Sequence, residues 1–120
     1  MVLEFQLIEF IEPSSFIPKL LDFMTETMTT FYDPIEKEDI YFLEFPKNDV
    51  LEDKSLKRKR IAGLSIGLAL GNIQQSKIKI YFEDNTSKKV VETTIWDISN
   101  DQVILKKDVA IPINRIYYSQ

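Results

Sequence analysis

The chain has 120 residues, of which 44% are hydrophobic and 28% are charged, and its formal net charge is −4. This length fits one domain, residues 1–120, and is enough to bury a core without disulfides or metal. Cysteine and histidine are both absent, which excludes thiol nucleophiles, Cys/His zinc sites and histidine general bases. We therefore predict a protein that is not an enzyme and that needs no cofactor and no metal.

Charge is segregated along the chain. Residues 1–53 carry 13 acidic and 3 basic side chains, whereas residues 54–120 carry 6 acidic and 12 basic ones. In one interpretation, the two halves pack together and partly neutralise each other within a single domain. In the other, the basic half faces a polyanion or the acidic half faces a basic partner.

No segment has the features of an export signal or of a membrane span. Residues 1–13 contain three glutamates and no basic residue, unlike a signal peptide. The longest apolar run, residues 61–73, is too short to cross a bilayer, which requires about 20 residues. We predict a cytoplasmic protein without a membrane partner.

One helix is predicted near the N-terminus, over about residues 16–31. Ser14 or Ser15 can cap it, and Pro18 suits its first turn because proline lacks the N–H that would be unpaired there. The helix should end before Pro34, since the residue preceding a proline disfavours helical backbone. The residues at helical spacing are Leu20, Leu21, Met24, Met28 and Phe31.

The middle of the chain is predicted as a strand, a loop and a second strand. Residues 39–45 form a compact apolar run, and residues 47–57 are polar. Residues 61–73 contain every glycine of the chain, at positions 63, 67 and 71. A helix here would present a small-residue face for close packing, but it would carry three glycines that each cost about 1 kcal/mol. We predict a strand, with large residues on one face and small ones on the other.

The C-terminal half alternates apolar and polar residues as antiparallel strands do. Together with the N-terminal helix it predicts an α+β fold, in which the helix packs on an antiparallel, strongly bent or barrel-like sheet of about five to seven strands. The acidic, helix-containing part spans residues 1–53, and the basic β-meander spans residues 58–118. The predicted elements of the meander are hairpins of residues 77–83 with 88–97 and of 103–106 with 109–113, a helical turn at 114–116 and a last strand at 116–118.

Residues 77–118 resemble the meander of small SH3-like or Sm-like β-barrels. The resemblance lies in the succession KIKIYFEDNTSKKVVETTIWDI, then NDQVILKKDVAIPI, then a tight turn and the closing RIYY. It covers about a third of the chain. It implies a barrel-like sheet, and barrels of this kind commonly bind RNA, DNA or short peptides.

The densest charge feature is the run Lys57-Arg58-Lys59-Arg60. Four adjacent cations can grip phosphates or serve as a nuclear localisation signal. Alternatively, the run is a solvated loop or strand entry whose lysines discourage edge-to-edge pairing of strands. Both interpretations stay open on the sequence alone.

The first hairpin predicts a second candidate surface. If Glu83 pairs with Lys88 across the turn, cations and aromatic rings alternate on one face of the hairpin. Such a face binds single-stranded nucleic acid, because bases stack on the rings while lysines follow the backbone. Alternatively, the N-terminal helix covers this face and its aromatic residues belong to the core. The candidate residues are Lys77, Lys79, Tyr81 and Trp96.

The function predicted from these features is a non-enzymatic protein-interaction module, either a homo-oligomer or a small acidic antagonist of a basic protein. The isoelectric point near 4.9 favours a protein partner, since nucleic-acid-binding domains are typically basic. The alternative is a single-stranded nucleic-acid-binding module of SH3-like or Sm-like type. In that case the basic run supplies attraction and the hairpin face supplies stacking.

Overall fold

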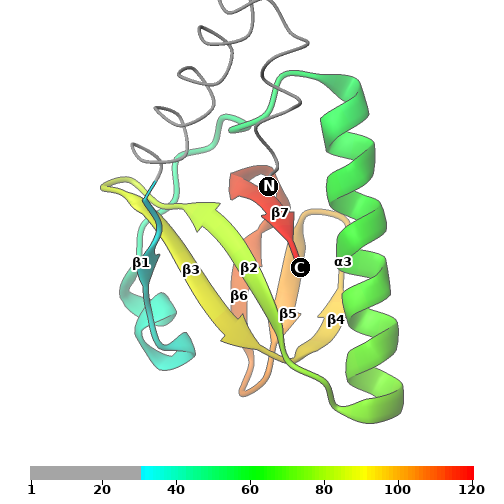
Figure 1. The fold of residues 1–120 in the computed structure, drawn as a ribbon. Coiled ribbons are helices and arrows are strands. Elements are labelled where there is room, and N and C mark those ends of the chain that lie inside the picture. Colours follow the sequence, from blue (N-terminus) through cyan, green and yellow to red (C-terminus); the bar gives the residue numbers. More distant parts are fainter. Residues whose placement is uncertain (1–30) are drawn as a thin grey trace, which may run out of the picture. The chain divides into compact units, whose positions relative to one another are not determined.

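In the computed structural model, which describes residues 31–120, two sheets and a long helix surround a single core (Figure 1). Tyr32–Gln120 form one compact unit. The predicted helix over residues 16–31 lies outside the described residues, except for Phe31. The elements are β1 (Asp33–Pro34), the 3-10 helix η1 (Lys37–Phe42), α3 (Lys54–Gln74), β2 (Ile78–Glu83), β3 (Lys88–Thr93), β4 (Ile95–Ile98), β5 (Gln102–Leu105), β6 (Val109–Pro112), the 3-10 turn η2 (Ile113–Arg115) and β7 (Ile116–Ser119).

The β-meander passes from one sheet to the other at Thr94. β2 and β3 pair with Glu83 opposite Lys88, as predicted, and belong to a four-stranded sheet of order β1-β3-β2-β7. β4, β5 and β6 form the second sheet. β1 joins β3 in parallel, and the other pairings are antiparallel. The mixed helix-and-sheet architecture of the predicted α+β fold is therefore confirmed.

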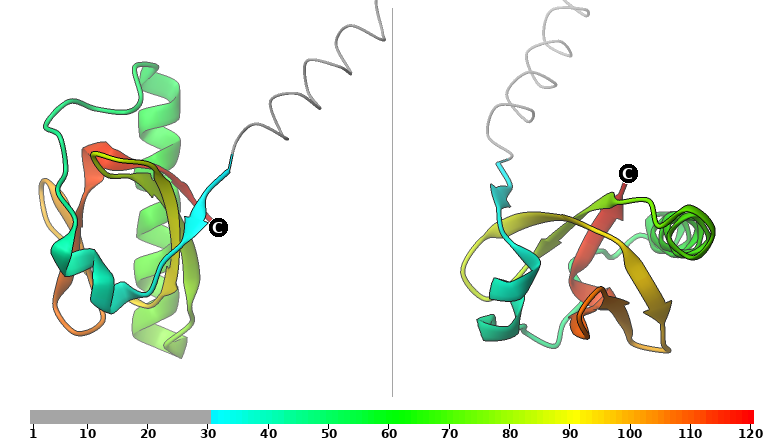
Figure 2. Two further views of the ribbon diagram at one scale, coloured as in Figure 1. Left: turned by 90° about the vertical axis from the view of Figure 1, so that its left-hand side faces the viewer. Right: turned by 90° about the horizontal axis from the view of Figure 1, so that it is seen from below.

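The predicted barrel-like sheet is corrected to two sheets that are not closed into a barrel. α3 packs against both β4 and β7, which are edge strands of the two sheets (Figure 2). Residues 88–97 contain no glycine, and a continuous strand needs a glycine kink or a bulge to bend sharply. The chain instead interrupts the strand at Thr94, and β4 starts the second sheet.

α3 overturns the strand predicted over residues 61–73. The helix begins at Lys54, where Asp53 caps it by accepting a 2.7 Å hydrogen bond from the Ser55 N–H. It therefore also includes the last residues of the loop predicted over 47–57. A serine, asparagine or aspartate in this position satisfies one of the unpaired N–H groups of a first helical turn.

Two of the three glycines, Gly67 and Gly71, let α3 pack closely against the strands. A Cβ atom on Gly67 would lie 2.5 Å from Cδ1 of Ile78, and one on Gly71 would lie 2.6 Å from the carbonyl oxygen of Ile95. At Gly71 the neighbouring atom is backbone, so only a residue without a side chain allows this approach, whereas at Gly67 the end of the Ile78 side chain would have to shift. The packing gained outweighs the intrinsic cost of glycine in a helix, about 1 kcal/mol each.

The apolar run at residues 39–45 is also not a strand, because its first half belongs to the 3-10 helix η1. In a 3-10 helix, residues three apart lie on the same side. Ile40 is accordingly buried, and Leu43 packs against the core. Tyr41 and Phe42, between them, are 80% and 78% exposed.

The core lies between the sheets and under α3, and the predicted core face of the first hairpin is confirmed. Phe82 and Ile80 are fully buried. The second hairpin, the helical turn and the last strand also form where the sequence predicts them. The other residues of the predicted core face, all buried, are Ile78, Val91, Thr93 and Ile95.

Candidate interaction surfaces

The basic run does not form one cationic surface. Arg60 is only 5% exposed, and its guanidinium donates to Asp49 Oδ1 at 2.8 Å and to Oδ2 at 2.9 Å. It also donates to the carbonyl oxygen of Ile116 at 3.0 Å. The hydrogen bonds from Arg60 lower the pKa of the Asp49 carboxyl, despite its partial burial. Arg60 is thus a structural residue, which corrects its place among the predicted binding residues.

The helix itself disperses the other three cations. Successive side chains of an α-helix point about 100° apart, so four adjacent residues face nearly all directions. Lys57 lies 3.7 Å from Asp49, Arg58 is exposed, and Lys59 borders a tyrosine-lined cavity. The ion pairs of Asp49 with Lys57 and Arg60 thus join one residue of the acidic part to two residues of the basic run.

The hairpin face exists, and three of its predicted residues share it. Lys77, Lys79 and Tyr81 line one hollow of about 470 Å³. Glu36 and Glu92 line the same hollow, so carboxylates accompany the lysines. The face is mixed in charge rather than purely cationic.

Trp96 lies on β4, in the other sheet, but it is still close to this face. It is 49% exposed and lines a second hollow, of about 430 Å³, together with Lys77 and Lys106. Lys77 borders both hollows and connects them. Lys106, which follows β5, is a cation that sequence reasoning missed, because only the sheet topology brings it near Trp96.

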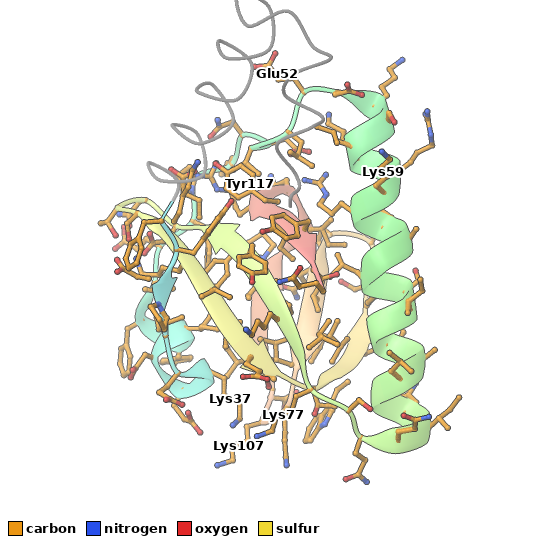
Figure 3. All side chains as sticks on the ribbon, viewed as in Figure 1. Lys37, Glu52, Lys59, Lys77, Lys107 and Tyr117 are labelled. Atoms are coloured by element: carbon orange, nitrogen blue, oxygen red, sulfur yellow. The ribbon has the colours of Figure 1, made fainter. Side chains whose placement is uncertain are left out.

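The basic run and the hairpin face lie far apart. Lys59 is near the N-terminal end of α3, and Lys77 follows its C-terminal end (Figure 3). The rise of 1.5 Å per helical residue separates Lys59 from the end of α3 by about 22 Å. The two features predicted to act together on one nucleic acid therefore do not form a continuous site.

A cluster of four tyrosines was not predicted. Tyr81 stacks on Tyr118 with ring centroids 4.4 Å apart, and Tyr32 meets Tyr81 edge-on at 4.9 Å. Lys88 Nζ lies 5.0 Å from the centroid of Tyr117, whose hydroxyl donates to Glu83. Only the adjacency of two tyrosines in the last strand signals this cluster in the sequence.

Burial suppresses ionisation of three members of the tyrosine cluster, Tyr32, Tyr117 and Tyr118. Desolvation, helped by Tyr118 and Glu83, raises the pKa of Tyr32 to about 12. Desolvation and the hydrogen bond to Glu83 also raise the pKa of Tyr117 above its ordinary value. Tyr32, Tyr117 and Tyr118 line a cavity of about 460 Å³ next to α3. These hydroxyls are therefore protonated donors rather than bases at neutral pH.

The outer face of α3 carries an apolar stripe, which we call the outer stripe. It consists of four residues spaced by four, three and four positions. All four are exposed, and the largest two, Ile66 and Ile73, are 62% and 78% exposed. The outer stripe is Ala62, Ile66, Ala69 and Ile73.

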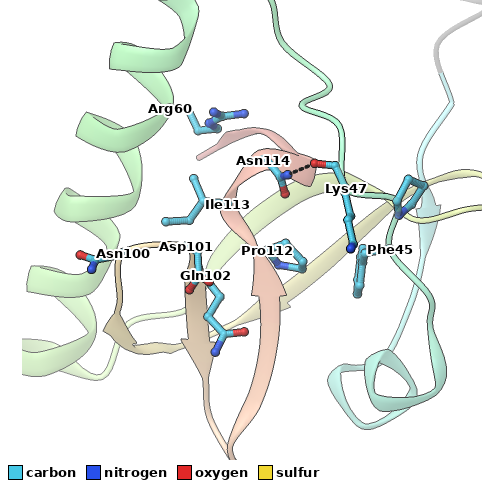
Figure 4. A pocket seen from close by; sticks show the side chains of 10 residues that line it. Phe45, Lys47, Arg60, Asn100, Asp101, Gln102, Pro112, Ile113 and Asn114 are labelled. Carbon is cyan, nitrogen blue, oxygen red and sulfur yellow. Dashed lines mark hydrogen bonds between the residues drawn. The ribbon is translucent and has the colours of Figure 1, made fainter.

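A further pocket of about 410 Å³ lies beside the second hairpin (Figure 4). Asn114 donates from Nδ2 to the carbonyl oxygen of Lys47 at its wall. Among residues 31–120, Asp101 is the one carboxylate that lines the pocket, and the neighbouring Arg60 is already paired with Asp49. The lining therefore offers no pair of carboxylates that could divide acid and base roles.

Comparison with known proteins finds no matching family model, no matching curated protein and no matching solved structure. Over residues 31–120, none of the helices has the length and apolar character to cross a membrane. In that same range, no three potential metal-ligating side chains gather closely enough to hold an ion.

Proposed function

We propose that the chain is a non-enzymatic protein-interaction module that docks a protein partner on the outer stripe of α3. The observation that carries this proposal is the exposure of Ile66 and Ile73, 62% and 78%, on a helix whose other face is packed on the core. Surface helices normally turn polar residues to solvent. A contiguous exposed apolar patch marks an interaction site.

The spacing of the outer stripe suits a helical partner. Apolar residues separated by four, three and four positions follow the pattern by which two helices pack along a seam. Residues 61–74 contain no charged side chain, so no buried charge would oppose docking on this part of α3. A strongly basic partner suits this surface poorly, because the charged residues of α3 are all cations.

Position-specific photo-crosslinking in the cells of origin tests the proposal. A photoreactive amino acid at Ile66 or at Ile73 should give a discrete adduct with a protein. The matched control is Gln74, which is also exposed but points about 100° away from Ile73. Absence of adducts, or equal adducts at all three positions, would refute docking on the outer stripe.

A second candidate function is binding of single-stranded nucleic acid by an SH3-like or Sm-like module. The supporting observation is that Lys77 borders both the hollow of Lys79 and Tyr81 and the hollow of Trp96 and Lys106. Residues 32–120 contain 14 basic and 14 acidic side chains. The negative net charge thus comes from residues 1–31 and does not weigh against a phosphate ligand on this unit.

Trp96, the only tryptophan of the chain, reports on this second function. Single-stranded oligonucleotide at low salt should quench its fluorescence, and added salt should restore it. Lys77→Ala should weaken binding of a labelled oligonucleotide, whereas Lys54→Ala, at the far end of α3, should not. Unchanged Trp96 emission at saturating oligonucleotide would exclude this function.

A further inference from the structure

We propose that the hollow lined by Trp96, Lys77 and Lys106, the Trp96 hollow, binds a phosphorylated nucleobase, with the base on the indole and the phosphate between the two lysines. This site is separate from the outer stripe and does not depend on protein docking there. It also goes beyond the second candidate function, because it assigns a single nucleotide to a single hollow. The volume of about 430 Å³ lies within the range of about 300–1,000 Å³ that is typical of small-molecule sites.

An irregularity in β4 presents Trp96 at this hollow. Ile95 pairs with Leu105 and Asp97 pairs with Ile104, so Trp96 is an extra residue without a partner on β5. A β-bulge of this kind redirects a side chain and is common beside functional sites. Half of the Trp96 side chain is exposed, and this exposed part of the indole offers a flat surface on which a base can stack.

Two cations flank the indole. Lys77 follows α3, and the N–H of Lys106 donates to the carbonyl oxygen of Thr94 at 3.1 Å, which fixes Lys106 beside the start of β4. Neither lysine forms an ion pair with a carboxylate of residues 31–120, and within that range no carboxylate lines the hollow. A phosphate monoester carries a charge of about −1.5 to −2 at neutral pH, which two ammonium groups match.

The nearby end of α3 does not cancel this positive charge. The free carbonyl groups at the end of a helix carry about half of one negative charge, against two full positive charges on the lysines. Two of the last carbonyl groups are also already paired. Those of Leu70 and Gly71 accept from the N–H groups of Ser76 and Gln75, at 3.4 Å and 2.9 Å.

Two carboxamide side chains, Asn72 and Gln75, complete the lining. A carboxamide both donates and accepts hydrogen bonds, as the edges of nucleobases do. Gln75 ends α3 in the left-handed conformation, with φ 54° and ψ 33°. Glycine is the residue that adopts this conformation without strain. Glutamine at this position therefore sacrifices stability and places a carboxamide at the hollow, as strained residues of binding sites do.

The neighbouring hollow of Lys79 and Tyr81 is less suited to the same ligand. Tyr118 stacks on one face of Tyr81 with ring centroids 4.4 Å apart, so that face is not free for a base. Glu36 and Glu92 line this hollow, and their carboxylates would repel a phosphate. The base and the phosphate therefore both belong in the Trp96 hollow.

Titration of the purified full chain at low salt tests the site. Adenosine monophosphate should quench the fluorescence of Trp96, the only tryptophan, and the quenching should saturate. Adenosine alone and inorganic phosphate alone should each bind at least about 10-fold more weakly, because each lacks one half of the interaction. If inorganic phosphate binds as tightly as the nucleotide, or if adenosine does, the hollow does not recognise a phosphorylated base and the proposal is overturned.

Two substitutions test the lysines against each other. Lys106→Gln should weaken binding of adenosine monophosphate about 10-fold. Lys107→Gln is the matched control, because Lys107 is the next residue, lies at the same end of the molecule as Lys77 (Figure 3) and is not part of the lining. Its variant should bind normally. Equal losses in both variants would indicate general attraction by charge and would overturn the proposal.

Gln75→Gly separates binding from folding. Because glycine relieves the left-handed backbone, this variant should unfold at a higher urea concentration than the unmodified chain. It should nevertheless bind adenosine monophosphate about 3-fold to 10-fold more weakly, since one hydrogen-bonding side chain is lost. A loss of affinity in a more stable protein cannot come from misfolding. Unchanged affinity would remove Gln75 from the site.

A single-stranded oligoadenylate without a terminal phosphate distinguishes the two sources of such a ligand. Tighter binding of the oligonucleotide than of the mononucleotide would assign the hollow to one nucleotide of a strand, and weaker binding would assign it to a free nucleotide. Quenching by the mononucleotide but not by the oligonucleotide would refute the second candidate function and leave this proposal standing. Quenching by neither would refute both.

Discussion

Gly71 of α3 lies against the backbone of Ile95, so that a Cβ atom on Gly71 would stand 2.6 Å from the Ile95 carbonyl oxygen and 3.0 Å from Cγ2 of Thr94. Thr94 is where the chain leaves one sheet, and Ile95 is where β4 begins the other. The C-terminal half of α3 is therefore fixed to the crossing point between the two sheets.

The first prediction concerns this contact. Gly71→Ala should lower the free energy of unfolding by about 2 kcal/mol, because the added methyl group meets backbone, which cannot move aside cheaply. Gly63→Ala is the matched control. Its Cβ would come close to the Ser119 hydroxyl, at 3.0 Å, which can rotate, and would lie at ordinary contact distance, 3.9 Å, from the Ser119 carbonyl oxygen, so alanine should be neutral or stabilise by up to about 1 kcal/mol. Urea unfolding measures both, and equal effects would contradict the close approach at Gly71.

The helix α3 could not be predicted from the sequence, in contrast to the first hairpin. The hairpin register was predictable, because the turn after Glu83 and the alternation of residues fix which face is buried. The helix α3 was not predictable from the sequence, because residues 61–73 are apolar both on the side that faces the core and on the outer side. This leaves no amphipathic pattern that would indicate a helix. The benefit of its glycines lies in contacts with β2 and β4, which local propensity does not contain.

The candidate site residues divide in the same way: a local pattern in the sequence predicts some of them, and the placement of the others depends on how the sheets are connected. Lys77, Lys79 and Tyr81 were found because they alternate along one strand. The sequence pattern predicts Trp96 on the same face as these residues. In the structure the chain crosses to the second sheet at Thr94, so Trp96 lies in that sheet, next to Lys106. The four adjacent cations of the basic run look like one surface in the sequence. In α3 they point in different directions, and Arg60 is buried.

The second prediction concerns the buried pair of Asp49 and Arg60. Asp49→Ala should cost about 3–5 kcal/mol, because it leaves a buried guanidinium without its counter-charge. The double variant Asp49→Ala, Arg60→Met should recover most of this loss, since no unpaired charge remains. Lys57→Ala, which removes only a partly exposed cation near the same carboxylate, should change stability by less than about 1 kcal/mol. Chemical unfolding of all three variants checks this, and a double variant no more stable than Asp49→Ala would disprove it.

The third prediction concerns acid unfolding and Asp84. Burial opposes ionisation of this carboxyl, but the N–H groups of Ser87 and Thr86, with Lys89, outweigh it and lower its pKa to about 2. Because the folded-state pKa lies below the unfolded value, the stabilisation is present above about pH 4 and is lost as the pH falls toward 2. Asp84→Asn should lose about 2 kcal/mol at neutral pH.

The pH profile separates this effect from a general loss of packing. Between pH 4 and 2 the unmodified chain should lose more stability than Asp84→Asn does, so that the two unfolding curves converge. Parallel curves over this interval would show that Asp84 does not titrate with the fold.

The fourth prediction concerns the alkaline limit of the tyrosine cluster. The pKa of Tyr32 is raised to about 12 by burial and by the neighbouring Tyr118 and Glu83, and burial also raises the pKa of Tyr117 and of Tyr118. A raised folded-state pKa means that the cluster stabilises the fold fully below about pH 10. That contribution is lost as the pH rises from 10 toward 12. Absorbance of tyrosinate from Tyr32, Tyr117 and Tyr118 should accordingly develop at higher pH in the folded chain than in denaturant.

Tyr117→Phe tests which contact matters in this cluster. The variant removes the hydroxyl that donates to Glu83 and should cost about 1 kcal/mol at neutral pH. Tyr41→Phe is the matched control, because Tyr41 is 80% exposed and its hydroxyl should not affect stability. Unfolding in urea at pH 7 measures both. A fully developed tyrosinate signal near pH 10, in a chain that circular dichroism still shows to be folded, would mean that the cluster is open to hydroxide and that its hydroxyls are not held protonated by burial.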